Sequence, residues 1–242
     1  MCKRWGRTED ANALKSQARP LVMTFPVLSL DSSEDGAVQP MALKAESLPV
    51  ALRPGAIVLI RHGEPALSRK CLLTAREYGD WWAKYEVGGL RAGQTPPAAL
   101  VAAAEGAGAI YVSSRQRAQE TAAAVAAGRE TMTDALFIEA PLPPPPFPHW
   151  FKLSPRWWGV VSRFWWHAFN HHGGQETRVQ ADSRAEQAAR VLVAKAAGGK
   201  DVLVFAHGYF NHMVGRRLKA DGWKLVQNQG FNYWSQRRYE KP

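Results

Sequence analysis

The sequence predicts an α/β fold, a three-layer sandwich in which a mostly parallel central sheet is flanked by helices. From residue 56 onward, short apolar runs alternate with helical stretches, which is typical of a parallel sheet covered on both faces. With 242 residues, of which 46% are hydrophobic, the chain is long enough to bury a sizeable core. Three of the apolar runs lead directly into segments with arginine or histidine, at the strand ends where such sheets bind ligands.

The expected strands and helices follow from periodicity and length. Apolar runs of strand length stand at residues 56–60, 109–112, 136–138 and 202–205. Helical stretches stand at residues 74–85, 97–104, 117–127 and 177–197. At residues 231–239 large apolar and polar side chains alternate, which predicts a final strand at an edge of the sheet.

Residues 1–55 are expected to form a flexible extension to a domain at residues 56–242. The segment lacks sustained periodicity and contains five prolines. No apolar run approaches the roughly 20 residues of a transmembrane helix, and the first twenty residues lack the pattern of a secretory signal. The two cysteines exclude a disulfide framework. We therefore expect a cytoplasmic protein.

The formal net charge of +10 does not by itself predict a nucleic-acid partner. Residues 1–55 hold seven basic and six acidic side chains, which leaves +9 on residues 56–242. There the basic residues are spread out, with no run of five or more. A basic cleft for an anionic substrate explains this distribution at least as well as a surface for DNA or RNA, so no nucleic-acid partner is expected.

A Pro/Trp-rich insertion at residues 141–172 is expected to cap the domain. Its proline run at residues 141–148 predicts an extended stretch, either a stiff connector or a docking site for a proline-binding module. Residues 147–169 hold five of the ten tryptophans. Helical spacing predicts an apolar face made of Trp157, Val160, Val161, Phe164, Trp165 and Phe169, and a narrow polar face made of Arg156, Ser162 and Arg163.

Three destinations stay open for this aromatic helix. As a cap, it would narrow the entrance to a site and favour substrates with a bulky or hydrophobic leaving group. As a subunit interface it would form a homodimer, because tryptophan is enriched at interfaces. As a membrane-surface contact, residues 147–169 would place indole rings at the level of the lipid headgroups.

The sharpest chemical signal is Arg61-His62-Gly63-Glu64, which follows the apolar run at residues 56–60. The run at residues 109–112 leads into Ser113 to Ala122, and the run at residues 202–205 leads into Ala206-His207-Gly208. Since the carboxyl ends of parallel strands meet at one edge of a sheet, these segments bring arginine and histidine side chains together. Guanidinium and imidazole donors at one place are suited to holding a phosphoryl group.

These three motifs, in this order, resemble those of the histidine phosphatase superfamily, in its phosphoglycerate mutase-like branch. The resemblance covers about residues 56–240 and implies that His62 is the nucleophile that accepts the phosphoryl group. It also implies a phosphate pocket formed by Arg61, Arg117 and His207. Within the family segment Arg-Ala-x-x-Thr-Ala, the register falls on Arg117, so Arg115 is expected at the rim.

By the same resemblance, the proton donor and acceptor is the carboxyl group after the third strand, which is Glu139 here. It would protonate the leaving alcohol and then activate the hydrolytic water. Glu64 is the rival candidate. The chain departs from mutase-like members at Ser68, where they usually carry asparagine, although a hydroxyl there is still able to bind phosphate.

The resemblance implies a metal-independent phosphomonoester hydrolase that works through phosphohistidine and needs no cofactor. His167, His171 and His172 lack an Asp or Cys partner at ligand spacing, so no metal site is expected. Two alternatives stay open, a phosphoglycerate mutase-type phosphoryl transferase and a non-catalytic phosphate-binding or scaffold protein. The substrate would be a phosphorylated small molecule or a phosphoprotein.

Overall fold

The structure, a computed structural model, describes residues 53–242, and a six-stranded sheet organises this part of the chain. The predicted extension at residues 1–55 therefore lies almost wholly outside the described residues. The strands are β1 (Ile57–Arg61), β2 (Ala109–Ser113), β3 (Met132–Asp134), β4 (Val202–Ala206), β5 (Lys224–Asn228) and β6 (Gln236–Glu240). Their order is β3-β2-β4-β1-β6-β5, and β6 runs in the opposite direction to the other five strands. The predicted mostly parallel sheet is confirmed.

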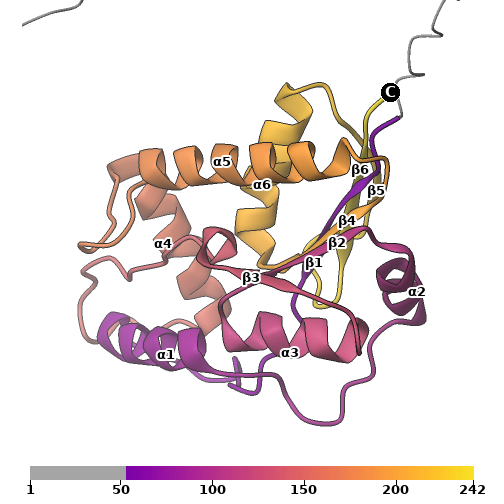
Figure 1. Cartoon of the computed structure of the whole chain (residues 1–242). Coiled ribbons are helices and arrows are strands. Elements are labelled where there is room, and N and C mark those ends of the chain that lie inside the picture. The colour runs from indigo at the N-terminus through magenta and orange to yellow at the C-terminus, as the bar shows by residue number, and fades with distance from the viewer. Residues whose placement is uncertain (1–52) are drawn as a thin grey trace, which may run out of the picture. The chain divides into compact units, whose positions relative to one another are not determined.

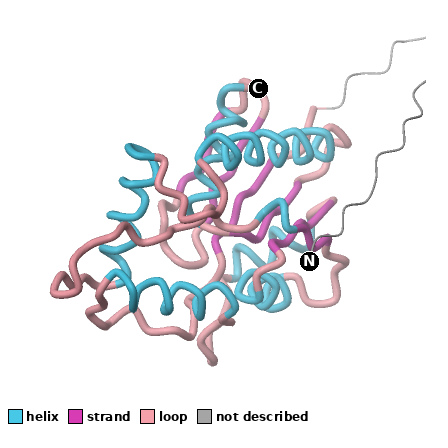
Figure 2. Tube along the Cα trace, turned by 90° about the vertical axis from the view of Figure 1, so that its left-hand side faces the viewer, coloured by secondary structure: helices cyan, strands magenta, loops and turns pink. Residues whose placement is uncertain are grey.

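Helices cover both faces of the sheet (Figures 1 and 2). On one face, Ile57 and Leu59 of β1 pack in a cluster with α5 (Arg178–Ala196) and α6 (Gly208–Ala220). On the other face, Val58 and Ile60 pack in a cluster with α2 (Ala98–Gly106) and α3 (Gln116–Val125). Alternate residues of one strand thus belong to two cores, which confirms the three-layer arrangement.

Two helices begin at capping boxes that the sequence encodes directly. Thr74 caps α1 (Ala75–Val87), and its hydroxyl and the Glu77 carboxylate each accept a backbone hydrogen bond from the other residue. Thr177 and Gln180 do the same at the start of α5. Each box satisfies amide groups that the first helical turn leaves unpaired, so both helices start where the sequence predicts.

The predicted strand at residues 136–138 is wrong. The third strand ends at Asp134, and a 3-10 helix, η1 (Ala135–Phe137), follows it. The Asp134 carboxylate accepts a hydrogen bond from Leu136 N at 2.8 Å, which favours a turn over an extended chain. Phe137 is nevertheless buried, so an apolar residue at this position indicates burial but does not indicate a strand.

The predicted C-terminal strand at residues 231–239 is right only in its last part, since β6 begins at Gln236. Residues 231–235 form a loop in which Trp234 has a positive φ of 61°. The predicted edge position is also wrong, because β5 lies outside β6. Strand β5 was not predicted, because its sequence, Lys-Leu-Val-Gln-Asn, is mostly exposed and contains no apolar run of strand length.

A third apolar cluster joins α1 to α4 (Pro155–Phe169), beyond the end of the sheet. The predicted helix at residues 156–169 is confirmed, but its predicted faces are wrong. The packed face is made of Trp158, Ser162 and Trp166, whereas Trp157 and Phe164 are exposed. None of the helices in residues 53–242 combines the length and apolarity needed to cross a membrane.

Candidate active site

The pairing of β1 with β4 brings two histidines together at one edge of the sheet. Arg61 of β1 lies opposite Ala206 of β4, so both strands end at the same level. His62 and His207 are the next residues along the chain. Their ring centroids lie 5.3 Å apart in an edge-to-face arrangement, and both side chains are buried.

One hydrogen bond defines the tautomer of His62. Its Nδ1 lies 2.7 Å from the carbonyl oxygen of Gly63, and a carbonyl only accepts, so Nδ1 carries the proton. The Nε2 atom therefore keeps its lone pair. Gly63 N in turn donates to Thr121 Oγ1 at 2.9 Å, which holds this turn of the chain against α3.

His207 is oriented from β2. Its Nε2 lies 2.9 Å from the Ser113 hydroxyl oxygen, and its Nδ1 is buried with no hydrogen-bond partner among the described residues. A buried polar atom without a partner is costly unless a ligand satisfies it. One nitrogen of this ring is therefore held by the fold, and the other is buried and unsatisfied in the described structure.

Arg61 and Arg117 also have buried nitrogen atoms without a hydrogen-bond partner in the described structure. The Arg117 guanidinium is fully buried and donates to the Tyr85 carbonyl and to Glu86 Oε1, both at 2.8 Å. Arg61 donates to the Phe231 carbonyl. Within the described part of the chain, the Nε atoms of both arginines are buried and unpartnered. Each guanidinium is thus fixed by its other nitrogens and keeps one donor available.

Burial and positive charge keep both histidines neutral. Desolvation and then the nearby Arg117 and Arg61 hold the pKa of His62 well below 6.5. The pKa of His207 is lowered in the same way, by desolvation first and then by Arg117 and His62. A neutral His62 has a nucleophilic nitrogen at physiological pH, and the arginines supply the positive charge that an anion requires.

Glu139 is fixed by the start of α6. Its Oε1 accepts a hydrogen bond from Phe210 N at 2.8 Å, and its Oε2 accepts one from Tyr209 N at 3.3 Å. These amides belong to the first turn of the helix, whose N–H groups have no partner within the helix itself. Glu139 therefore has a defined position although it lies in a loop.

Four of these side chains, which come from three segments of the chain, line one cavity of about 520 Å³. Its lining includes Arg61, His62, Arg117 and Glu139, and also Gly208, the residue after His207. A nucleophilic nitrogen, fixed cationic donors and a carboxyl group next to one cavity can together carry out phosphoryl transfer.

Comparison with known proteins agrees with this arrangement. A family model described as histidine phosphatase superfamily (branch 1) matches residues 92–235, which contain Arg117, Glu139 and His207. The chain belongs to the histidine phosphatase superfamily. The matched range begins after His62, so the place of His62 in the site rests on the geometry described above.

Solved structures share the histidine phosphatase fold. A mycobacterial glucosyl-3-phosphoglycerate phosphatase solved with VO3 is 20% identical, with a TM-score of 0.51, covering 76% of this chain and 92% of that chain. A protein described as mycobacterial hydrolase 1 is also 20% identical, with a TM-score of 0.51. The match covers 76% of this chain and 88% of that chain. No curated protein matches the sequence. Family and fold together identify an enzyme of the histidine phosphatase class.

Ser68 does not join the residues expected to bind phosphate. It is exposed, its hydroxyl accepts a hydrogen bond from Lys70 N at 3.1 Å, and it does not line the cavity. Its neighbour Arg69 lines the cavity instead, and its charge contributes to the low pKa of His62. Arg115, expected at the rim, forms an ion pair with Glu86 at 2.7 Å outside this cavity.

Sequence reasoning missed the cavity residues that come from α1. Four aromatic residues of α1 line it, namely Tyr78, Trp81, Trp82 and Tyr85, together with Arg163 of α4. Trp81 and Trp82 pack in the same cluster and both line the cavity, so their adjacency in the sequence did not distinguish a core role from a cavity role. Among residues 53–242, no three His, Cys, Asp or Glu side chains are grouped to hold a metal ion.

Proposed function

We propose that this enzyme hydrolyses phosphomonoesters without a metal, through a phosphohistidine formed on His62. The observation that carries the proposal is the free lone pair on His62 Nε2, beside buried donors that have no partner in the described structure. A phosphoryl group entering the cavity would satisfy those donors. Its negative charge would be balanced by Arg61 and Arg117.

The reaction has two steps. First, His62 Nε2 attacks phosphorus, the N–P bond forms as the bond to the ester oxygen breaks, and the Glu139 carboxylic acid gives its proton to the leaving alcohol. Second, the Glu139 carboxylate takes a proton from water, whose oxygen attacks phosphorus and releases inorganic phosphate and neutral His62. His207 and the two arginines bind the phosphoryl oxygens in both steps.

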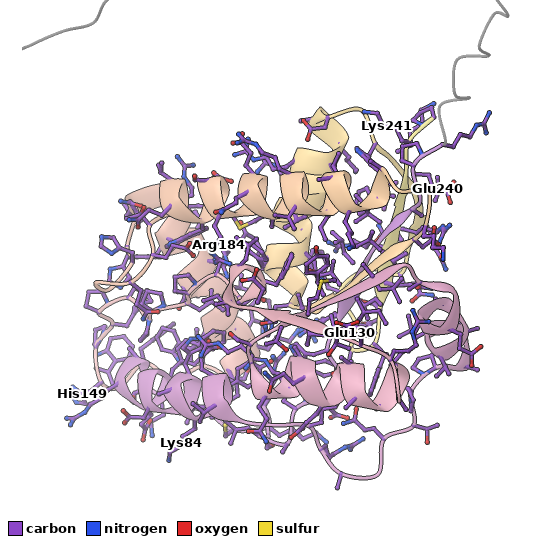
Figure 3. All side chains as sticks on the ribbon, viewed as in Figure 1. Lys84, Glu130, His149, Arg184, Glu240 and Lys241 are labelled. Atoms are coloured by element: carbon purple, nitrogen blue, oxygen red, sulfur yellow. The ribbon has the colours of Figure 1, made fainter. Side chains whose placement is uncertain are left out.

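Rapid quenching of the enzyme with a radiolabelled phosphomonoester tests this mechanism. We expect label on the protein that is labile in acid and stable in base, and neither label nor turnover in His62→Ala. His149→Ala is the matched control, because His149 is exposed and projects from the periphery of the fold (Figure 3). Turnover that persists in His62→Ala, or that a chelator abolishes, would contradict the proposal.

A further inference from the structure

The cavity next to His62 continues into a compartment lined by aromatic and aliphatic side chains of α1 and α4. We call it the aromatic compartment, and it is lined by Tyr78, Trp81, Trp82, Tyr85, Val160 and Phe164. The volume of about 520 Å³ is within the range that accommodates a small organic molecule. The three arginines Arg61, Arg69 and Arg117 line the same cavity and have their charges near His62.

The aromatic side chains of the compartment are in direct contact with the arginines. The ring of Tyr85 has the Arg117 guanidinium 4.5 Å and the Arg69 guanidinium 5.2 Å from its centroid. Trp81 stacks on Tyr85 with centroids 5.0 Å apart, and Tyr78 stacks on Trp81 at 5.9 Å. An ester whose phosphoryl group is held by the arginines would therefore have its alcohol next to this stack.

Three of the polar side chains around the compartment, those of Arg163, His167 and Arg69, are already engaged. Arg163 stacks on Tyr209 at 3.7 Å and donates to the carbonyls of Ala140 and Pro141. His167 is hydrogen-bonded to the Tyr209 hydroxyl, and Arg69 donates to the Tyr85 hydroxyl at 2.8 Å. A sugar would lose water here and find few free partners for its hydroxyl groups, which is unfavourable.

On the α4 side of the compartment, apolar side chains are exposed to solvent. Val160 and Phe164 line the cavity and yet are 55% and 57% exposed. An apolar ligand would cover both side chains and remove their surface from water. The Tyr78 hydroxyl, buried without a partner among the described residues, offers one donor to a single polar atom in such a ligand.

Building on the hydrolase activity proposed above, we propose that the substrate is a phosphomonoester of a bulky apolar alcohol, and that the alcohol lies in the aromatic compartment. Monoalkyl phosphates with ethyl, butyl, hexyl and octyl chains test this, because their leaving groups have similar basicity and differ in apolar length. We expect kcat/KM to rise about two- to fourfold per added methylene until the compartment is filled.

Variants on α4 locate the effect. The double variant Val160→Ser/Phe164→Ser should flatten the rise of kcat/KM with chain length. Phe169→Ser is the matched control, because Phe169 lies on the same helix, is 64% exposed and does not line the cavity. It should keep the wild-type rise.

Two further comparisons complete the design. Monomeric octyl phosphate and phosphatidic acid in vesicles distinguish a free ester from a membrane lipid as the source, and turnover of either one supports an apolar alcohol. Hydrolysis that depends on His62 but has a flat or falling chain-length series overturns this proposal alone. Absence of hydrolysis for every ester, p-nitrophenyl phosphate included, overturns the proposed function and this substrate class with it.

Discussion

The imidazole rings of His62 and His207 meet edge to face, with centroids 5.3 Å apart, because β1 and β4 are parallel neighbours that end at the same level. Each ring has one nitrogen fixed by the fold, His62 Nδ1 by the Gly63 carbonyl and His207 Nε2 by Ser113. The other nitrogen of each ring is left without a partner in the described structure. The pair is thus oriented before any ligand arrives, which lowers the cost of binding.

The low pKa values of these histidines predict a pH-dependent stability. An unfolded histidine takes up a proton as the pH falls through about 6.5, whereas buried His62 and His207 stay neutral because their pKa values lie well below that. The free energy of unfolding should therefore decrease as the pH falls from 7 to 5.5, by up to about 1.4 kcal/mol per pH unit for each histidine. Urea unfolding at several pH values measures this slope.

A pair of variants assigns the slope to the site. His62→Asn should remove roughly half of the pH dependence of the free energy of unfolding. His149→Asn, at an exposed position, should retain it. Equal slopes in the two variants would show that the buried histidines do not cause the effect.

The ion pair between Glu86 and Arg117 predicts a large loss of stability when the carboxylate is removed. The Arg117 side chain is fully buried and the Glu86 side chain is 14% exposed, with the charged atoms 2.8 Å apart. Glu86→Gln leaves a buried guanidinium without its counterion, which should cost about 3 kcal/mol and raise KM for phosphate esters. Chemical denaturation and steady-state kinetics measure the two effects.

The matched control is another glutamate that pairs with an arginine, but at the surface. Glu186 pairs with Arg190 on α5, and these side chains are 45% and 73% exposed. Glu186→Gln should change stability by at most about 0.5 kcal/mol. A similar loss in both variants would show that burial of Arg117 does not set the cost.

The sequence predicted the parts of the site that follow strands. Arg61 ends β1, and His62 and His207 directly follow β1 and β4, so the parallel sheet alone brings them to one edge. Glu139 was placed by family resemblance, after a strand that proved to be a 3-10 helix, and the amides of α6 fix its position.

The α1 side of the aromatic compartment could not be predicted, because it depends on how α4 packs against α1 outside the sheet. Helical periodicity showed that α4 is apolar on more than one side, but it does not say which side a neighbouring helix covers. In the structure, Trp158 and Trp166 pack inward, and Trp157 is exposed. Two residues of the predicted apolar face, Val160 and Phe164, do line the cavity next to α1 aromatics, whereas Trp157 and Trp165 do not.

Gly63 should tolerate no side chain. A Cβ atom there would lie 2.5 Å from Cζ2 of Trp234, whose indole nitrogen donates to Gln94 at 3.0 Å. Gly63→Ala must therefore displace Trp234 or His62, at a cost of about 1–3 kcal/mol and most of the turnover. Gly106→Ala is the control, since a Cβ there meets nothing within 4 Å, and it should be neutral or stabilising. Thermal unfolding and turnover are measured for both variants. Equal unfolding temperatures and equal turnover in Gly63→Ala and Gly106→Ala would refute the packing argument.

The proposed double role of Glu139 predicts that the effect of Glu139→Gln depends on the leaving group. An alkoxide needs a proton as it departs, whereas p-nitrophenolate leaves readily without one. Turnover of an alkyl phosphate should therefore fall by about 10²–10⁴-fold, with no burst of alcohol. With p-nitrophenyl phosphate, phosphohistidine should form in a burst of p-nitrophenol and then hydrolyse slowly, because the base is missing.

Stability measurements separate this role from the contacts of Glu139 with α6. The carboxylate accepts hydrogen bonds from Tyr209 N and Phe210 N, and glutamine retains one acceptor oxygen, so unfolding should lose only about 1 kcal/mol. Glu64→Gln tests the rival carboxylate, which pairs with exposed Arg91. Glu64→Gln should show the same time course of p-nitrophenol release and the same turnover as the wild-type enzyme. Equal losses for alkyl and aryl esters in Glu139→Gln would show that Glu139 positions the site and does not transfer the proton.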